Sequence, residues 1–209
     1  MIVFSVGLSS CTSGSNSSPL TDYQLAVSES LSNQEKENGL VGGLHFGMTQ
    51  ATFFDYCKRQ QKLGRMNDGA DNMIRVYVDS SAIPGTTVLE FYPGFNENGE
   101  INFLKGRIYS LQWAPWSPQY NALNLLDEGR EYLIEQLGGA PFKQYESVKE
   151  NTLVKLDANR RVLIYPHEFA QERLVFLVHN LDDSEEEVLK GVDVLPVTYP
   201  TLSSETNGH

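Results

Sequence analysis

Few residues of this 209-residue chain have the types and spacing that catalysis requires. His167 and Glu168 begin a zinc-protease pattern, but that motif needs a second histidine four residues after the first, so that both imidazoles face one metal. Position 171 is Gln171. A polar loop after Pro166 is therefore the better interpretation, and we expect neither a metal nor another cofactor.

The remaining reactive residues also favour structural roles. Cys57 would be a nucleophile only if a nearby base stabilised its thiolate, and a cysteine among aromatic residues on a helix more often packs in the core. The acidic run from Asp182 to Glu187 lacks the tight glycine turn of a calcium loop. It is typical of the solvated start of a short helix. The sequence thus predicts no catalytic residues.

Composition excludes one class of partner and permits a folded core. The formal net charge is −11, which opposes binding to the phosphates of nucleic acids. Hydrophobic residues make up 40% of the chain, enough for a core, but no run of 18 apolar residues predicts a membrane span. We therefore expect a folded domain that does not bind nucleic acid.

An apolar N-terminus, residues 1–10, ends in Leu8-Ser9-Ser10 and is followed by Cys11. This pattern resembles the bacterial lipobox, in which a leucine and two small residues precede a cysteine that is lipidated when the signal is removed. The resemblance implies a lipid-anchored protein of the bacterial cell envelope, on the outer-membrane or periplasmic side, with Cys11 as the lipidation site. No basic residue precedes the apolar run, as a signal requires, and a gene model that starts late explains this.

The composition also changes along the chain. The residues that follow Cys11 are rich in Ser, Asn, Gln and Glu, and such a segment buries too little apolar surface to order itself. The sequence predicts a signal remnant at 1–10, a flexible tether at 11–38, a domain at 39–181, and a short helix with a loose tail at 182–209.

The first half of the predicted domain, about 39–116, begins with a helix. Thr49 is placed to cap its start, Met48 and Phe53 have the spacing of a hydrophobic staple, and Gly64 can end it. Strands are predicted at 73–79, 86–92, 101–105 and 107–113, the last two as a hairpin around Gly106.

The second half, about 117–181, opens with a helix predicted over 117–141. Ser117 can cap it, Pro118 suits its first position, and Gly138 can end it. Spacings of three and four place one set of residues on a common face: Ala122, Leu126, Gly129, Leu133 and Leu137. Strands are predicted at 151–156, 160–165 and 173–179, with the last in the middle of the sheet because it is apolar on both faces.

This order of elements predicts an α+β fold: an antiparallel sheet backed on one face by two main helices, in two similar halves. Two segments resemble β-lactamase-inhibitor-protein-like envelope lipoproteins, namely Gly47-Met48-Thr49 at a helix start and Leu133-Ile-Glu-Gln-Leu-Gly-Gly-Ala-Pro141 at a helix end. The resemblance spans about residues 40–180. It implies tandem helix-and-sheet units that serve binding or scaffolding more than catalysis.

Strand alternation divides the sheet residues into two sets. We expect Ile74, Val76, Val78, Leu89, Phe91, Val154 and Leu156 to face the helices. The opposite face should carry Arg75, Tyr77, Glu90, Tyr92 and Lys155, with Tyr165 as a further member. Tyr and Arg dominate interface hot spots, so the candidate binding residues are Arg75, Tyr77, Tyr92, Lys155 and Tyr165, with Trp113 and Trp116 at the edge. Alternatively, the tyrosines lie on strands only because of their high β-propensity, and the tryptophans pack the joint between the two halves.

These features together predict a non-enzymatic binding or scaffolding module, anchored to the membrane only through lipid. Its expected partner is another envelope protein or an envelope polymer. Two alternatives stay open: a secreted-side hydrolase whose site is assembled from distant residues, and an inhibitor of a secreted enzyme.

Overall fold

A computed structural model describes residues 20–83 and 85–183. The lipidation site predicted at Cys11, the signal remnant and nearly all of the tail lie outside the described residues. In the described part, three α-helices accompany one antiparallel sheet of seven strands. The fold is α+β, as predicted.

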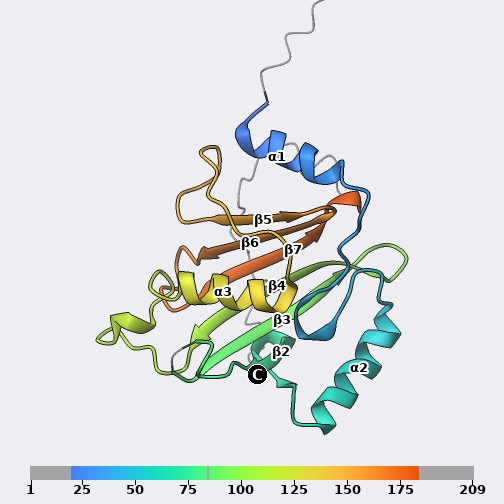
Figure 1. The fold of residues 1–209 in the computed structure, drawn as a ribbon. Coiled ribbons are helices and arrows are strands. Elements are labelled where there is room, and N and C mark those ends of the chain that lie inside the picture. Colours follow the sequence, from blue (N-terminus) through green and yellow to red (C-terminus); the bar gives the residue numbers. More distant parts are fainter. Residues whose placement is uncertain (1–19, 84, 184–209) are drawn as a thin grey trace, which may run out of the picture.

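The sheet joins two consecutive groups of strands. The strands are β1 (Asn67–Asp68), β2 (Ile74–Tyr77), β3 (Thr87–Phe95), β4 (Ile101–Ser110), β5 (Leu153–Asp157), β6 (Arg160–Pro166) and β7 (Leu174–Asn180). Their order is β1-β2-β3-β4-β7-β6-β5, so the two groups meet where β4 pairs with β7 (Figure 1). The central position predicted for β7 is confirmed.

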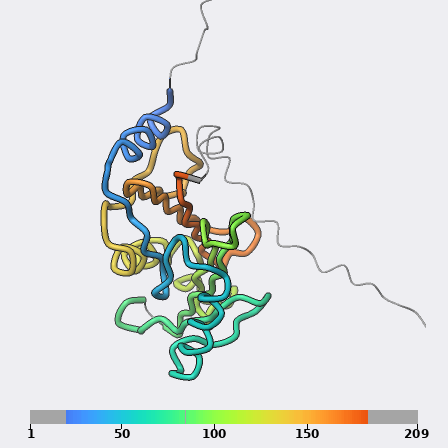
Figure 2. Tube along the Cα trace, turned by 90° about the vertical axis from the view of Figure 1, so that its right-hand side faces the viewer, coloured from blue at the N-terminus to red at the C-terminus, as the bar shows by residue number. Residues whose placement is uncertain are grey.

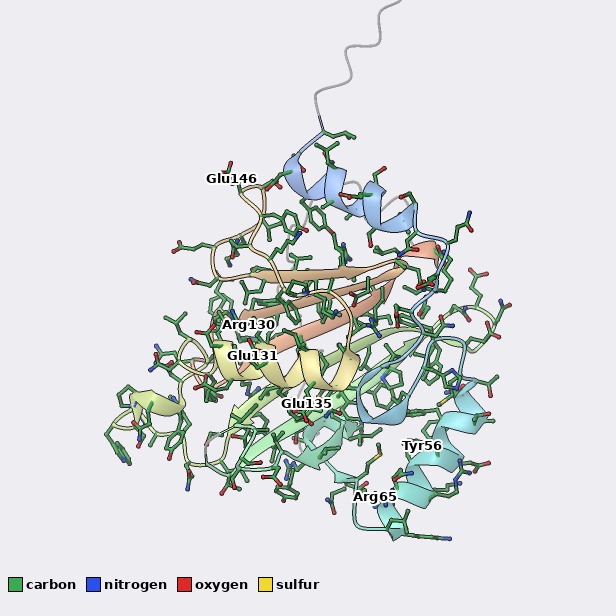
Figure 3. The ribbon with its side chains drawn as sticks, viewed as in Figure 1. Tyr56, Arg65, Arg130, Glu131, Glu135 and Glu146 are labelled. Carbon is green, nitrogen blue, oxygen red and sulfur yellow. The ribbon has the colours of Figure 1, made fainter. Side chains whose placement is uncertain are left out.

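Helix α2 (Gln50–Lys62) forms as predicted. The Thr49 side chain accepts a hydrogen bond from the Thr52 N–H, and Gly64 adopts a φ of 69° just past the helix end. On its inner side, Phe53 is buried. The Tyr56 hydroxyl, labelled in Figure 3, donates to the Gly42 carbonyl at 2.9 Å and fixes the segment before the helix.

Helix α3 (Leu126–Leu137) is shorter than predicted. Residues 118–120 form a separate 3-10 turn, and Ser117 makes no side-chain cap. The start expected at Ser117 is wrong because Asn121 is extended, with a ψ of 160°, and its side-chain oxygen accepts the Asn124 N–H. Gly138, with a φ of 64°, follows the helix as expected. Of the predicted buried face, Leu126 is only partly buried; the other members are buried.

Both main helices contribute to one large core on a single face of the sheet. Phe53 of α2 and Leu133 of α3 belong to the same buried cluster as Leu89 and Phe91 of β3. Ile74 and Val76 of β2 pack against this cluster, as strand alternation predicts. The first face of the sheet is therefore the one backed by α2 and α3.

A third helix, α1 (Asp22–Leu31), contributes to the other face. Thr21 and Gln24 form a capping box at its start. Tyr23 and Val27 are buried in a second core cluster with Val154, Leu163, Tyr165 and Val175. In two views α1 lies at the β5 end of the molecule and α2 at the opposite end (Figure 1, Figure 2). A flexible tether reaching residue 38 is therefore wrong for this stretch, and Val154 and Leu156 face α1 rather than the two main helices.

The hairpin predicted around Gly106 is also wrong. Gly106 lies inside the continuous strand β4, and the true hairpin joins β3 to β4 through the turn that contains Asn98 and Gly99. A Cβ atom at position 106 would lie 2.1 Å from Cζ of Phe176 on the neighbouring strand β7. The glycine therefore makes room for an aromatic ring.

Candidate functional site

The predicted binding residues do not share one exposed face. Lys155 is fully buried and pairs with Val162, which belongs to the core under α3. Its Nζ donates to the Ala140 carbonyl at 2.6 Å. Tyr165 is buried in the second core. The expected exposure of Lys155 and Tyr165 is wrong, because helices lie against both faces of the sheet.

The other strand residues take three different environments. Tyr92 is half-buried and its ring meets Phe53 of α2 edge-on at 5.8 Å, so it does not point away from the helices as predicted. The Arg75 side chain is 25% exposed and forms an ion pair with Glu90. Tyr77 is exposed on the edge of the sheet. Of the five strand residues, only Tyr77 is more than half exposed, and Arg75 and Tyr92 are partly exposed.

Glu90, expected on the exposed face, is instead a buried ion-pair partner. Its carboxylate accepts hydrogen bonds from Arg75 Nε at 2.8 Å, from Arg107 Nε at 2.7 Å and from the Ala70 N–H at 3.2 Å. Burial alone would raise the pKa of Glu90, but the bonds from both arginines outweigh it and hold the pKa below its ordinary value. Glu90 therefore stays ionised and holds the strands together.

Two other groups with catalytic chemistry are also held in unreactive forms. Burial raises the pKa of the Cys57 thiol to about 11, so the thiolate is scarce at neutral pH. Burial, together with the charge of Arg161, lowers the pKa of His179 to about 3. His179 is therefore neutral, and its Nδ1 atom lies 3.2 Å from a guanidinium nitrogen of Arg161. Among residues 20–83 and 85–183, no three His, Cys, Asp or Glu side chains are grouped to hold a metal ion.

Among the residues that the structure describes, the two most exposed aromatic side chains lie on two loops at one end of the sheet. Trp116 is 83% exposed on the loop between β4 and α3, and Phe169 is 80% exposed on the loop between β6 and β7. The first loop also exposes Leu111 and Leu123, and its yellow-green 3-10 turn extends beyond the sheet at the left of Figure 1. We call Leu111, Trp116, Leu123 and Phe169 the loop site.

Internal hydrogen bonds fix the shape of these loops. The Ala122 N–H donates to the Gln171 carbonyl at 2.7 Å, which joins the two loops, and Ala122 itself is buried. His167 Nδ1 accepts the backbone N–H groups of Phe169 and Ala170, each at 3.1 Å. His167 thus organises a polar loop after Pro166, as predicted in place of a zinc site.

The sequence predicts only part of the loop site. Trp116 was predicted as an edge residue and is exposed, whereas Trp113 is half-buried. Phe169 was missed, since a single aromatic residue in a polar loop carries no pattern. The nearby Pro166 and the predicted turn were the only local signals, and they do not place residue 169 beside residues 111–125.

No helix in the described ranges combines the length and the hydropathy needed to cross a bilayer. Comparison of the chain with models of known protein families, with curated proteins and with solved structures finds no match.

Proposed function

We propose that this chain is a non-enzymatic binding module of the bacterial cell envelope, anchored by lipid at Cys11, that holds another envelope protein through the loop site. The observation that carries the binding role is the exposure of Trp116 and Phe169 on two loops that are bonded to each other. The Leu8-Ser9-Ser10-Cys11 pattern supports the anchor.

The chemistry of the loop site favours a protein partner. The two loops carry four exposed apolar side chains, and exposed apolar groups mark interaction surfaces when they form a patch. Tryptophan is among the residue types enriched in interface hot spots. The site combines two aromatic rings with two leucines, whereas stacking on a sugar would need only the rings. Because hydrogen bonds already fix both loops, little conformational entropy is lost when a partner binds.

A binding role also agrees better than hydrolysis with the state of the reactive groups. A hydrolase needs a nucleophile or a base whose pKa lies near the working pH. The pKa of Cys57 is about 11, which is too high for a thiolate nucleophile at neutral pH. The pKa of His179 is about 3, which is too low for an effective general base at neutral pH. Glu90 is held by two arginines. These three groups are therefore suited to stability rather than to turnover.

The test is partner recovery from native envelopes with the full-length chain. Trp116→Ala and Phe169→Ala should each reduce crosslinked partner at least about tenfold, since a hot-spot truncation costs about 2 kcal/mol or more. Phe54→Ala, which removes another exposed aromatic ring on α2, is the matched control and should leave recovery unchanged. Equal recovery from all three variants would refute the protein-binding role.

The anchor is tested separately. Cys11→Ala should release the protein from membranes and abolish incorporation of labelled fatty acid. A Cys11→Ala variant that still carries labelled fatty acid would refute lipidation at this position without affecting the loop-site result.

A further inference from the structure

A groove of about 670 Å³ opens at the other end of α3 from the loop site. Its walls come from the second half of α1, the segment that follows it, residues 139–143 and the turn between β5 and β6. Helix α3 has 12 residues and so is about 18 Å long. The loop site precedes its first turn and the groove wall follows its last, so the two sites are separate.

Buried ionic contacts hold the groove walls in place. Oδ1 of Asp157 accepts a hydrogen bond from the Ala140 N–H at 2.6 Å. Oδ2 of the same carboxylate forms ion pairs with Arg160 at 2.9 Å and with Lys155 at 2.5 Å. Gly139, with a φ of 77°, sits directly on this carboxylate, because a Cβ there would lie 2.5 Å from the Asp157 oxygen. These contacts attach residues 139–143 to the sheet, so this side of the groove is preorganised without a ligand.

The opposite wall is tied to the same β5–β6 turn. The Ser30 hydroxyl of α1 donates to the Ala158 carbonyl at 2.9 Å, and the Glu37 N–H donates to the Asn159 side chain at 2.8 Å. Both walls thus rest on one hairpin. A groove of this size, held open by its own hydrogen bonds, falls in the range of ligand sites.

The lining pairs carboxylates with apolar surface. The charge of Asp157 is balanced by the buried Lys155 and Arg160. The Glu37 carboxylate lies 3.8 Å from the Arg160 guanidinium. Glu29 and Glu35 line the groove, are exposed, and form no ion pair with any residue in the described ranges. The lining also includes the apolar side chains of Ala26, Pro141, Leu156 and Ala158. Lys143 is the only cationic residue among the described lining residues.

We infer that this groove binds alkylammonium groups, as carried by a lysine side chain of a peptide or by a free linear polyamine. The methylene chain would lie on the apolar lining and the ammonium groups would pair with Glu29 and Glu35. The Coulomb attraction between a carboxylate and an ammonium group strengthens as the ligand excludes water from the groove. The net charge of −11 attracts the same ligands from a distance.

Isothermal titration of the full-length chain with two probes tests the inference and identifies the source. The probes are spermidine and an acetylated trilysine amide. At 0.15 M salt, the double variant Glu29→Gln/Glu35→Gln should weaken binding of the preferred probe at least tenfold. Tighter binding of the trilysine probe assigns the peptide source, and tighter binding of spermidine assigns the free amine.

The matched control removes the same charge elsewhere. Glu131 and Glu135 lie exposed on α3 (Figure 3), and Glu131→Gln/Glu135→Gln should change affinity less than twofold. Equal weakening by both double variants would overturn the inference, because overall charge would then explain binding. Failure of both probes to bind, or displacement of the bound probe by equimolar magnesium, would also overturn it. None of these outcomes bears on partner recovery through the loop site.

Discussion

Asp157→Asn removes the carboxylate that the buried Lys155 and Arg160 share. Asparagine keeps an oxygen for the Ala140 N–H, but its amide nitrogen replaces the oxygen that both cations contact. Each charge-assisted hydrogen bond contributes about 1.5–3 kcal/mol. Breaking a buried ion pair from one side costs about 3–5 kcal/mol, and we expect a loss of unfolding free energy in that range at pH 7.

The pH dependence of this loss follows from Lys155. Burial lowers the pKa of Lys155 below its ordinary value of 10.5, although Asp157 opposes the shift. Without Asp157 the pKa falls further. Between the folded pKa and 10.5 the unfolded chain binds more protons than the folded one, so stability rises with pH in that window. The deficit of Asp157→Asn should therefore shrink as the pH rises from 7 toward 10.5, because neutral Lys155 needs no counter-charge.

Urea unfolding at a series of pH values measures both effects. Asp127→Asn is the control, since the Asp127 side chain is 79% exposed and its pair with Arg130 is a surface ion pair worth about 0–1 kcal/mol. Subtracting the control corrects for other groups that titrate at alkaline pH. A loss below about 1 kcal/mol at pH 7, or a deficit independent of pH, would refute the role assigned to Asp157.

Three further expectations concern the core. Leu133→Ala should cost about 2–5 kcal/mol in urea unfolding, and a loss below half of one kcal/mol would mean that α3 does not press this residue into the core. Gly106→Ala should cost about 1–3 kcal/mol, because its methyl group displaces the Phe176 ring; unchanged stability would contradict the close contact. In a Cys11→Ser background, alkylation of Cys57 should be far slower than that of free cysteine at pH 7 and should still accelerate above pH 9. A rate equal to that of free cysteine at pH 7 would contradict the raised pKa.

Elements with local signals could be predicted from the sequence. Thr49 and Gly64 bound α2 within a residue or two, because capping needs only neighbouring groups. The alternation of β2 placed Ile74 and Val76 correctly toward the main core. The start of α3 was missed because Ser117 and Pro118 begin a 3-10 turn as readily as an α-helix.

Features that depend on distant contacts could not be predicted. Two buried residues, Tyr23 and Val27, attach α1 to the sheet, and a pattern so short does not distinguish a docked helix from a polar tether. A charged residue such as Lys155 has the same alternation whether it meets water or a carboxylate. For the loop site, the bond from Ala122 to Gln171 is what brings the two loops together, and it connects residues almost fifty positions apart.

The pairing of β4 with β7 has to wait until β7 has been synthesised. Residues 111–173 separate these strands in the chain, so the β3–β4 hairpin is complete long before β7 exists. At about 5–20 residues per second, the delay is about 3–13 s. During that time the outer edge of β4, from Phe103 to Ile108, has none of its final backbone partners. An unpaired edge strand is a template for other chains, so nascent chains that stop before Leu174 are the ones we expect to aggregate or to need a chaperone.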